Sequence, residues 1–428
     1  MPVGFQVSGV LTALGPDTST PRAAEWWATR RRPHRAGDQP PADPQMAVDV
    51  HAHVLLPDVE ALVAGQPGLA ATRRRATGYP GLESAVENEA LSDTSPSTSK
   101  SPRRPFALGT SAGISMLLSL AHVDSAMPSQ AMQDVISAFL QRREGASGKP
   151  KLTLGDRRAA FGPAGTVYPL PDDVSVTAVV AGAVPAHWLA TPDVDPGRVL
   201  VYLHGGGYTM GSIRSHGELA ARLGRDSGCR VLVPEYRLAP EHPFPAALDD
   251  ALSAWRWLRS SQALPASSLA VVGDSAGGGL GLALVLQLRD NGEDLPAALA
   301  LMSPWTDLTL SGATMSEPVR DPVLTPDGVR QLAKDYLAGT QPTNVLASPL
   351  FASLSGLPPM LVQVGGAELL LSDPQRLADA AQAAGVDVTL EIRDGLPHVY
   401  QSVVLAPEAT LATAAMGRFL RTRMTGRR

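Results

Sequence analysis

Ser275 is the residue whose type and neighbours in the sequence most clearly predict a chemical role. It lies in the segment Gly273-Asp274-Ser275-Ala276-Gly277, which has the spacing G-x-S-x-G. An apolar run over 269–272 precedes it and a run of small residues over 276–289 follows, which predicts a strand, a sharp turn and a helix. In such a nucleophile elbow the flanking glycines avoid collisions and the serine hydroxyl stands above the sheet edge. A glycine-rich turn that merely contains a serine is the alternative, so the partners of Ser275 decide between the two.

A serine hydroxyl attacks a substrate only when a general base takes its proton. Of the nine histidines, His398 alone lies after Ser275 in the chain. It stands in a predicted loop after the apolar run 386–392, which places it at the same sheet edge as the elbow. We therefore predict that His398 is the base, the alternative being a histidine that only holds its loop by hydrogen bonds.

The acid that orients the base should follow another strand, between the serine and the histidine. A predicted strand over 360–364 leads into a loop that holds both Glu368 and Asp373. Glu368 follows the strand closely, whereas Asp373 precedes a proline and a predicted helix, where an N-cap role explains it. Glu368 is therefore the preferred acid, and Asp373 stays the alternative.

A second glycine-rich segment, H-G-G-G at 204–207, follows an apolar run. Glycines let backbone N–H groups turn inward without a side chain in the way. We predict that the N–H groups of Gly205, Gly206 and Ala276 hold the negative oxygen of a tetrahedral intermediate, while His204 braces the loop. A phosphate-binding loop is the alternative, and it is disfavoured because no Gly-Lys-Ser/Thr follows.

The fold must position these side chains and N–H groups close to one another. From residue 198 onward apolar runs alternate with helical patterns, which predicts an α/β fold with a mostly parallel central sheet and helices on both faces. Reactive residues should then lie on loops beyond the carboxyl ends of the strands. Predicted strands cover 174–180, 185–189, 199–203, 230–233, 269–272, 297–302, 360–364 and 386–392, the first two being antiparallel edge strands. Predicted helices cover 219–223, 246–258, 276–289, 329–336 and 374–384, and the segment 398–421 runs into a last helix.

The chain divides into three regions by composition. Residues 1–45 are rich in Pro, Arg and Ala without periodicity, and 87–104 read as a linker. Residues 127–165 contain two predicted helices, which form either a cap over a pocket or N-terminal packing. We expect an N-terminal extension over 1–126 that is largely disordered or a remnant, then the helical cap, then a catalytic domain over 166–425.

His51 and His53 end an apolar run as H-x-H. Residues 47–86 thereby resemble the start of the metal-dependent amidohydrolases, in which two such histidines bind a metal. That barrel fold needs about 250 residues, and its further ligands come from later strands. Two histidines without further ligands make a poor metal site. We therefore expect a remnant without a metal site, and no metal or organic cofactor.

Bulk composition narrows the function further. The 428 residues are 44% hydrophobic and can bury a large core, while a net charge of -5 does not support nucleic-acid binding. The one cysteine, Cys229, excludes an intramolecular disulfide and lies in an apolar run, which predicts a buried thiol. No secretory signal is evident, and the apolar stretch 106–121 is short for a spanning helix. We expect a cytoplasmic protein without strong membrane attachment, and a homodimer is left open.

Taken together, the motifs resemble the hormone-sensitive-lipase-like (bacterial family IV) carboxylesterases of the α/β-hydrolase fold. The likeness rests on H-G-G-G at 204–207 and G-D-S-A-G-G at 273–278, with further matches over 235–246 and 303–308. It runs from about residue 127 to the C-terminus. The resemblance implies short acyl esters as substrates. The chain departs from many members at the acid, where Glu368-Leu369-Leu370 replaces Asp-Pro-Leu and resembles a subgroup with Glu at that place.

The expected activity is that of a serine carboxylesterase, which hydrolyses short-chain acyl esters of small molecules through an acyl-enzyme. A lactone or N-formyl amide hydrolase with the same triad is the first alternative. A non-catalytic ligand-binding protein on the same fold is the second, and the presence of both Ser275 and His398 disfavours it. We also expect Arg237 to pair with Glu241 and Asp274 to hold the elbow by hydrogen bonds.

Overall fold

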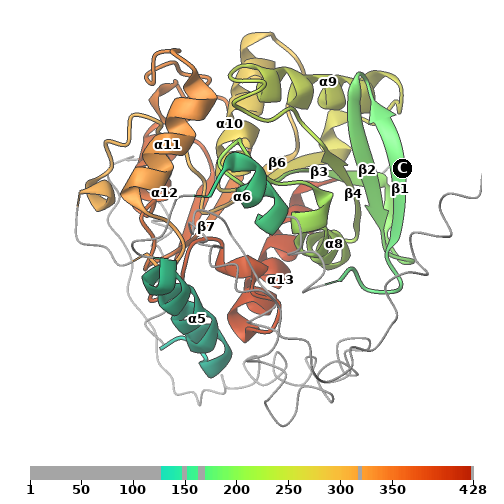
Figure 1. Ribbon diagram of the computed structural model, residues 1–428. Helices are drawn as coiled ribbons and strands as arrows, with labels where there is room; N and C mark the ends of the chain where they lie inside the picture. The colour runs from blue at the N-terminus through green and yellow to red at the C-terminus, as the bar shows by residue number, and fades with distance from the viewer. Residues whose placement is uncertain (1–126, 147–151, 162–168, 317–320, 426–428) are drawn as a thin grey trace, which may run out of the picture. The chain divides into compact units, whose positions relative to one another are not determined.

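One sheet of eight strands runs through the computed structural model, which describes residues 127–146, 152–161, 169–316 and 321–425 (Figure 1). Its order is β1-β2-β4-β3-β5-β6-β7-β8. β1 pairs antiparallel with β2, and β2 with β4, while the remaining pairs are parallel. The predicted mostly parallel sheet with antiparallel edge strands is therefore confirmed. The strands are β1 (Ser175–Ala181), β2 (Val184–Ala190), β3 (Asp195–Leu203), β4 (Cys229–Pro234), β5 (Leu269–Asp274), β6 (Ala298–Met302), β7 (Met360–Gly365) and β8 (Val388–Arg393).

Helices cover both faces of the sheet, because its central strands are apolar on both sides. In β3, Leu200 and Tyr202 face one apolar cluster while Val199, Val201 and Leu203 face the other, and all five are fully buried. The first cluster includes α8 (Ile213–Ser227) and α13 (Pro407–Arg423). The second includes the remaining long helices after β4, which are α9 (Ala246–Ser260), α10 (Ala276–Asp290), α11 (Pro326–Leu337) and α12 (Ser372–Ala383).

The last helix begins well after His398. Within the segment 398–421, which the sequence predicts to run into a helix, a short 3-10 turn spans Tyr400–Ser402 and α13 starts at Pro407. Proline lacks an N–H and is tolerated only in the first turn of a helix, so α13 cannot extend back through it. His398 consequently lies in a loop between β8 and the 3-10 turn.

Two helices precede the sheet within the predicted cap. α5 (Gln130–Ala146) buries Met132, Val135 and Phe139. α6 (Leu154–Phe161) buries Phe161 against the second apolar cluster. Polar contacts fasten α5 at both ends: Ser129 bonds to Glu408 of α13, and Arg143 bonds to the backbone ahead of α11.

Several predictions fall outside the described residues. His51, His53 and the apolar stretch 106–121 lie outside the ranges that the structure describes. The N-terminal extension and the division into three regions therefore stay predictions. Cys229 is buried as predicted, and burial raises the pKa of its thiol. Among the helices of the described ranges, none combines the length and apolar character needed to cross a membrane.

Candidate active site

Ser275 occupies a strained turn between β5 and α10. Its backbone has φ +51° and ψ -121°, a conformation that side-chain-bearing residues rarely adopt and that is held by its surroundings. The Ser275 N–H donates to the carbonyl of Met302. A Cβ added to Gly273 would lie 2.3 Å from the carbonyl oxygen of Gly277, and one added to Gly277 would lie 2.0 Å from that of Leu203. The elbow predicted from G-x-S-x-G, including its need for both glycines, is what the structure contains.

His398 and Glu368 meet Ser275 at the carboxyl edge of the sheet. His398 Nε2 lies 2.9 Å from Ser275 Oγ, and His398 Nδ1 lies 2.5 Å from Glu368 Oε2. A carboxylate only accepts hydrogen bonds, so Nδ1 carries the proton and Nε2 is left as the acceptor that faces the serine hydroxyl. Ser275, Glu368 and His398 are exposed by 5%, 0% and 2%, which keeps this chain of hydrogen bonds away from bulk water.

Ser303 is part of this arrangement, although sequence reasoning did not single it out. Its Oγ donates to Glu368 Oε1 at 2.8 Å and accepts the N–H of Val399 at 3.1 Å. The Gly365 N–H also donates to Glu368 Oε1, at 2.6 Å. Glu368 is thus held by Gly365 of β7 and by Ser303 of the loop after β6. The Ser303 hydroxyl also holds Val399, the residue that follows His398. The only signal was its place in the family-like segment 303–308.

Asp373 does not contact His398 and instead holds a loop of the fold. Its Oδ2 accepts the N–H groups of Thr306 and Asp307, both at 2.9 Å, and its Oδ1 pairs with Arg376. The predicted N-cap role is wrong, because α12 begins at Ser372 and Asp373 lies inside its first turn. Its carboxylate instead ties α12 to the loop after β6. Both oxygens of the alternative triad acid are therefore engaged, one by the loop after β6 and the other by Arg376 of α12.

The oxyanion loop requires one correction. The Gly205 N–H donates to Asp274 Oδ1 at 3.0 Å, and Tyr202 donates its hydroxyl to the same oxygen at 2.6 Å. The N–H of Gly205 is thus engaged by Asp274, which argues against the predicted role of Gly205 as an oxyanion donor. The hydrogen bonds of Asp274 agree with the bracing role predicted for it. Within the described residues the N–H groups of Gly206 and Gly207 donate to no protein atom. The backbone φ angles of these two glycines are positive, at +112° and +60°.

Ala276 is the third residue that the sequence predicts as an oxyanion donor. It is the first residue of α10, where the N–H groups of a helix have no intrahelical acceptor. The positive end of the helix dipole adds to the attraction for a negative oxygen. The geometry therefore offers Gly206, Gly207 and Ala276 as amide donors beside Ser275.

Known proteins resemble this chain in sequence and in fold. A family model of the alpha/beta hydrolase fold matches residues 200–402. An acetyl-hydrolase of Streptomyces hygroscopicus is 40% identical over 295 residues, which are 68% of this chain and 95% of that protein. A crystal structure of an esterase from the bacterial hormone-sensitive lipase family matches with a TM-score of 0.66 and 42% identity, covering 70% of this chain and 100% of that one. The chain belongs to the hormone-sensitive-lipase-like carboxylesterases. An ethyl acetate hydrolase of Pseudomonas putida is also related, at 35% identity over 237 residues, 53% of this chain and 74% of that protein.

In this carboxylesterase the loops beside the oxyanion glycines are braced differently from the prediction. Arg237 pairs with Asp250 through two nitrogens, not with Glu241. Glu241 pairs instead with Arg158 of α6 at 2.7 Å, and Arg158 also donates to the carbonyl of Thr209. Arg158 thereby connects α6 both to Glu241 and to the segment that follows the predicted oxyanion glycines.

His204 braces the esterase from inside. Its Nδ1 donates to the carbonyl of Gly205 at 2.8 Å, and its ring stacks on Tyr236 with centroids 4.2 Å apart. Burial and the neighbouring His216 lower the pKa of His204 to about 3, so its ring is neutral at physiological pH. A neutral, stacked ring agrees with the predicted bracing role.

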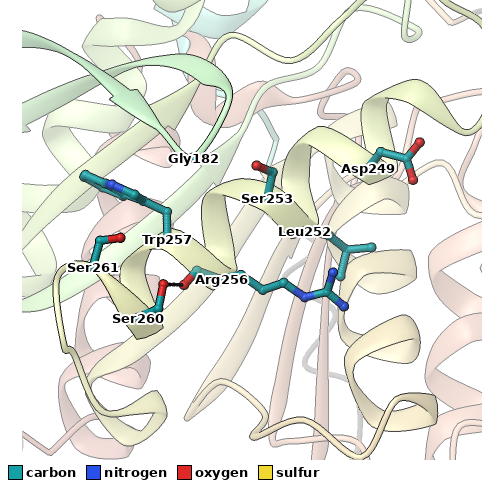
Figure 2. A pocket seen from close by; sticks show the side chains of 8 residues that line it. All are labelled: Gly182, Asp249, Leu252, Ser253, Arg256, Trp257, Ser260 and Ser261. Carbon is teal, nitrogen blue, oxygen red and sulfur yellow. Dashed lines mark hydrogen bonds between the residues drawn. The ribbon is translucent and has the colours of Figure 1, made fainter. Parts of the chain in front are cut away.

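The described part of the esterase contains no group of three or more His, Cys, Asp or Glu side chains arranged to hold a metal ion. A hollow beside α9 and the turn between β1 and β2 is lined by the side chains in Figure 2. Ser253 Oγ accepts the N–H of Ala183, Ser260 Oγ donates to the carbonyl of Arg256, and the Arg256 guanidinium pairs with Glu293. These three polar groups are already paired and none of the proposed catalytic residues lines the hollow, so we assign it no chemistry.

The acid limb of the pH profile tests His398 as the base. Burial alone would lower the pKa of His398, but the charge and hydrogen bond of Glu368 act in the opposite direction and raise it above the ordinary value of 6.5. A base works in its neutral form, so activity is lost as pH falls through this raised pKa. We expect kcat/KM for a neutral ester to rise with pH through a midpoint above 6.5, measured between pH 5 and 9. A rate independent of pH over this range would exclude His398 as the base.

Proposed function

We propose that Ser275 is the nucleophile of this carboxylesterase, His398 its general base and Glu368 the acid that orients the base. The observation that carries this assignment is the pair of distances at His398: 2.9 Å from Nε2 to Ser275 Oγ and 2.5 Å from Nδ1 to Glu368 Oε2. One imidazole thus faces a hydroxyl with its acceptor nitrogen while a buried carboxylate holds its other side. That is the arrangement that serine acyl transfer requires.

The reaction then proceeds in two halves. His398 Nε2 takes the Ser275 proton as Oγ attacks the ester carbonyl, and the carbonyl oxygen becomes an oxyanion. We propose that the N–H groups of Gly206, Gly207 and Ala276 stabilise it. The imidazolium returns the proton to the leaving alcohol, which leaves an acyl group on Oγ. Water then attacks the acyl-enzyme with the same base, which releases the carboxylic acid and restores the serine.

For the substrate we propose esters of short acyl groups, acetyl esters first. Two relatives carry names that point this way, the acetyl-hydrolase of Streptomyces hygroscopicus and the ethyl acetate hydrolase of Pseudomonas putida. The triad by itself would serve a lactone or an N-formyl amide equally well, because all three present a carbonyl to the same hydroxyl. The names of the relatives favour the simple ester.

A substrate series tests this proposal. We expect kcat/KM for p-nitrophenyl esters to be highest between acetate and butyrate and to fall on the order of tenfold or more at decanoate, because a pocket shaped for short chains cannot accept added methylenes without strain. A lactone and an N-formyl amide are assayed in parallel at equal concentration. Highest activity on decanoate, or on either of the other two classes, would contradict the short-ester assignment.

Two further properties stay proposals. We propose that the enzyme is cytoplasmic, and fractionation of the producing cells tests this location. Light scattering of the purified protein distinguishes the monomer from the homodimer that the sequence left open.

A further inference from the structure

Asp321 is a second fully buried carboxylate close to the proposed catalytic pair, on the segment that leads into α11. It is 1% exposed. Its Oδ1 accepts the N–H groups of Val323 and Leu324, at 2.7 and 2.8 Å. Its Oδ2 accepts the N–H of Leu369 at 2.6 Å. Leu369 directly follows Glu368, so this hydrogen bond fixes the backbone from which the proposed acid extends.

Three N–H donors that converge on one side chain favour its ionised form, since a carboxylate offers acceptors on both oxygens. Burial raises the pKa of Asp321, and the charge of His398 and the amide hydrogen bonds act against that rise. The negative charge of Asp321 also raises the pKa of His398, as the charge of Glu368 does. Three carboxylates thus raise the pKa of His398: Glu368 after β7, Asp321 ahead of α11 and, less strongly, Asp274 of β5.

The cap contributes to the position of Asp321. Arg143 of α5 donates to the backbone carbonyl of Asp321 at 2.5 Å. The segment is therefore held on one side by a cap helix and on the other by the turn that carries Glu368. Neither contact places Asp321 against Ser275, so any influence on the reaction passes through other residues.

We propose that Asp321 is a positioning residue of the esterase: it fixes the Glu368 turn through Leu369 and supplies a second buried negative charge that favours the imidazolium form of His398. The proposal rests on the proposed function, because it concerns the same base. An imidazolium forms each time Ser275 loses its proton. A fixed negative charge in a water-poor interior stabilises that cation without reorganisation during the reaction. Asp321 would then assist the base without touching the substrate.

The experiment compares Asp321→Asn with wild type in kcat, KM and the pH profile of kcat/KM on p-nitrophenyl acetate. We expect kcat to fall on the order of tenfold, since positioning is part of general-base catalysis. We expect the midpoint of the acid limb to move down by about one pH unit, because His398 loses a nearby negative charge. Asp321→Ser is assayed alongside, because its hydroxyl can still accept an amide N–H but carries no charge.

Asp307→Asn is the matched control. Asp307 is also 1% exposed, accepts the N–H groups of Thr309 and Ser311, and pairs with Arg376. Its loss should lower thermal stability and leave the midpoint of the acid limb unchanged. A midpoint that stays at the wild-type value in folded Asp321→Asn or Asp321→Ser would overturn the proposal, and so would failure of both variants to fold, which would assign Asp321 to the fold alone. Wild-type rates in Ser275→Ala would instead overturn the proposed function.

Discussion

Replacing Ser275 by alanine is expected to lower kcat for p-nitrophenyl acetate by about 10⁵- to 10⁶-fold. Without Oγ no acyl-enzyme forms, and the remaining oxyanion donors can assist only direct attack by water. KM should change little, because the hydroxyl contributes little to binding of the ester ground state. Steady-state rates on extensively purified protein measure the fall, and mass spectrometry after a serine-directed phosphonate should find the label on wild type and not on the variant.

Ser227→Ala is the control for this loss. Ser227 is also buried, lies near the end of α8 and donates its hydroxyl to the carbonyl of Gly224. Its removal deletes a hydroxyl of the same kind outside the proposed site. Ser227→Ala should retain the wild-type kcat with a modest loss of stability, about 1 kcal/mol. If Ser275→Ala keeps a rate close to that of Ser227→Ala, then Ser275 is not the nucleophile.

Glu368→Gln is expected to lower kcat by about 10⁴-fold. The glutamine amide can donate to His398 Nδ1, which would put the proton on Nε2 and turn the wrong tautomer toward Ser275. The imidazolium would also lose its charge partner, so the acid limb of the pH profile should move to lower pH. Steady-state kinetics between pH 5 and 9 measure both effects on one variant.

Asp373→Asn separates the two candidate acids. It keeps the size of the side chain and removes a buried charge that accepts two backbone N–H groups and pairs with Arg376. We expect a loss of stability of about 1–3 kcal/mol, measured by urea unfolding, with kcat within about tenfold of wild type. A collapse of kcat in Asp373→Asn with a near-normal rate in Glu368→Gln would transfer the acid role to Asp373.

Much of the fold could be predicted because its signals are local. An apolar run of the right length predicts a buried strand, and the alternation of such runs with helical patterns predicts a parallel sheet with covered faces. The start of the last helix was left open, and a single residue sets it. Pro407 starts α13, so His398 lies in a loop, as predicted.

The members of the candidate site could be named for the same reason. Ser275 is marked by its flanking glycines, whose absent side chains the turn requires, and His398 is marked by being the one histidine after it. Glu368 is marked by its place directly after a strand. Each of these signals is a residue type at a position along the chain. The sequence by itself thus determined the sheet, the elbow and the three residues that meet at its edge.

Only the tertiary structure decided which polar groups pair with one another. The Gly205 N–H is taken by Asp274, Arg237 pairs with Asp250, and Ser303 and Asp321 support the Glu368 turn. Whether a hydrogen bond forms depends on differences of a few tenths of an ångström in the distance between donor and acceptor, and long-range packing sets that distance. Residue spacing carries no such information. The glycine loop could therefore be located from sequence, whereas the choice of the N–H groups left to face a substrate required the folded chain.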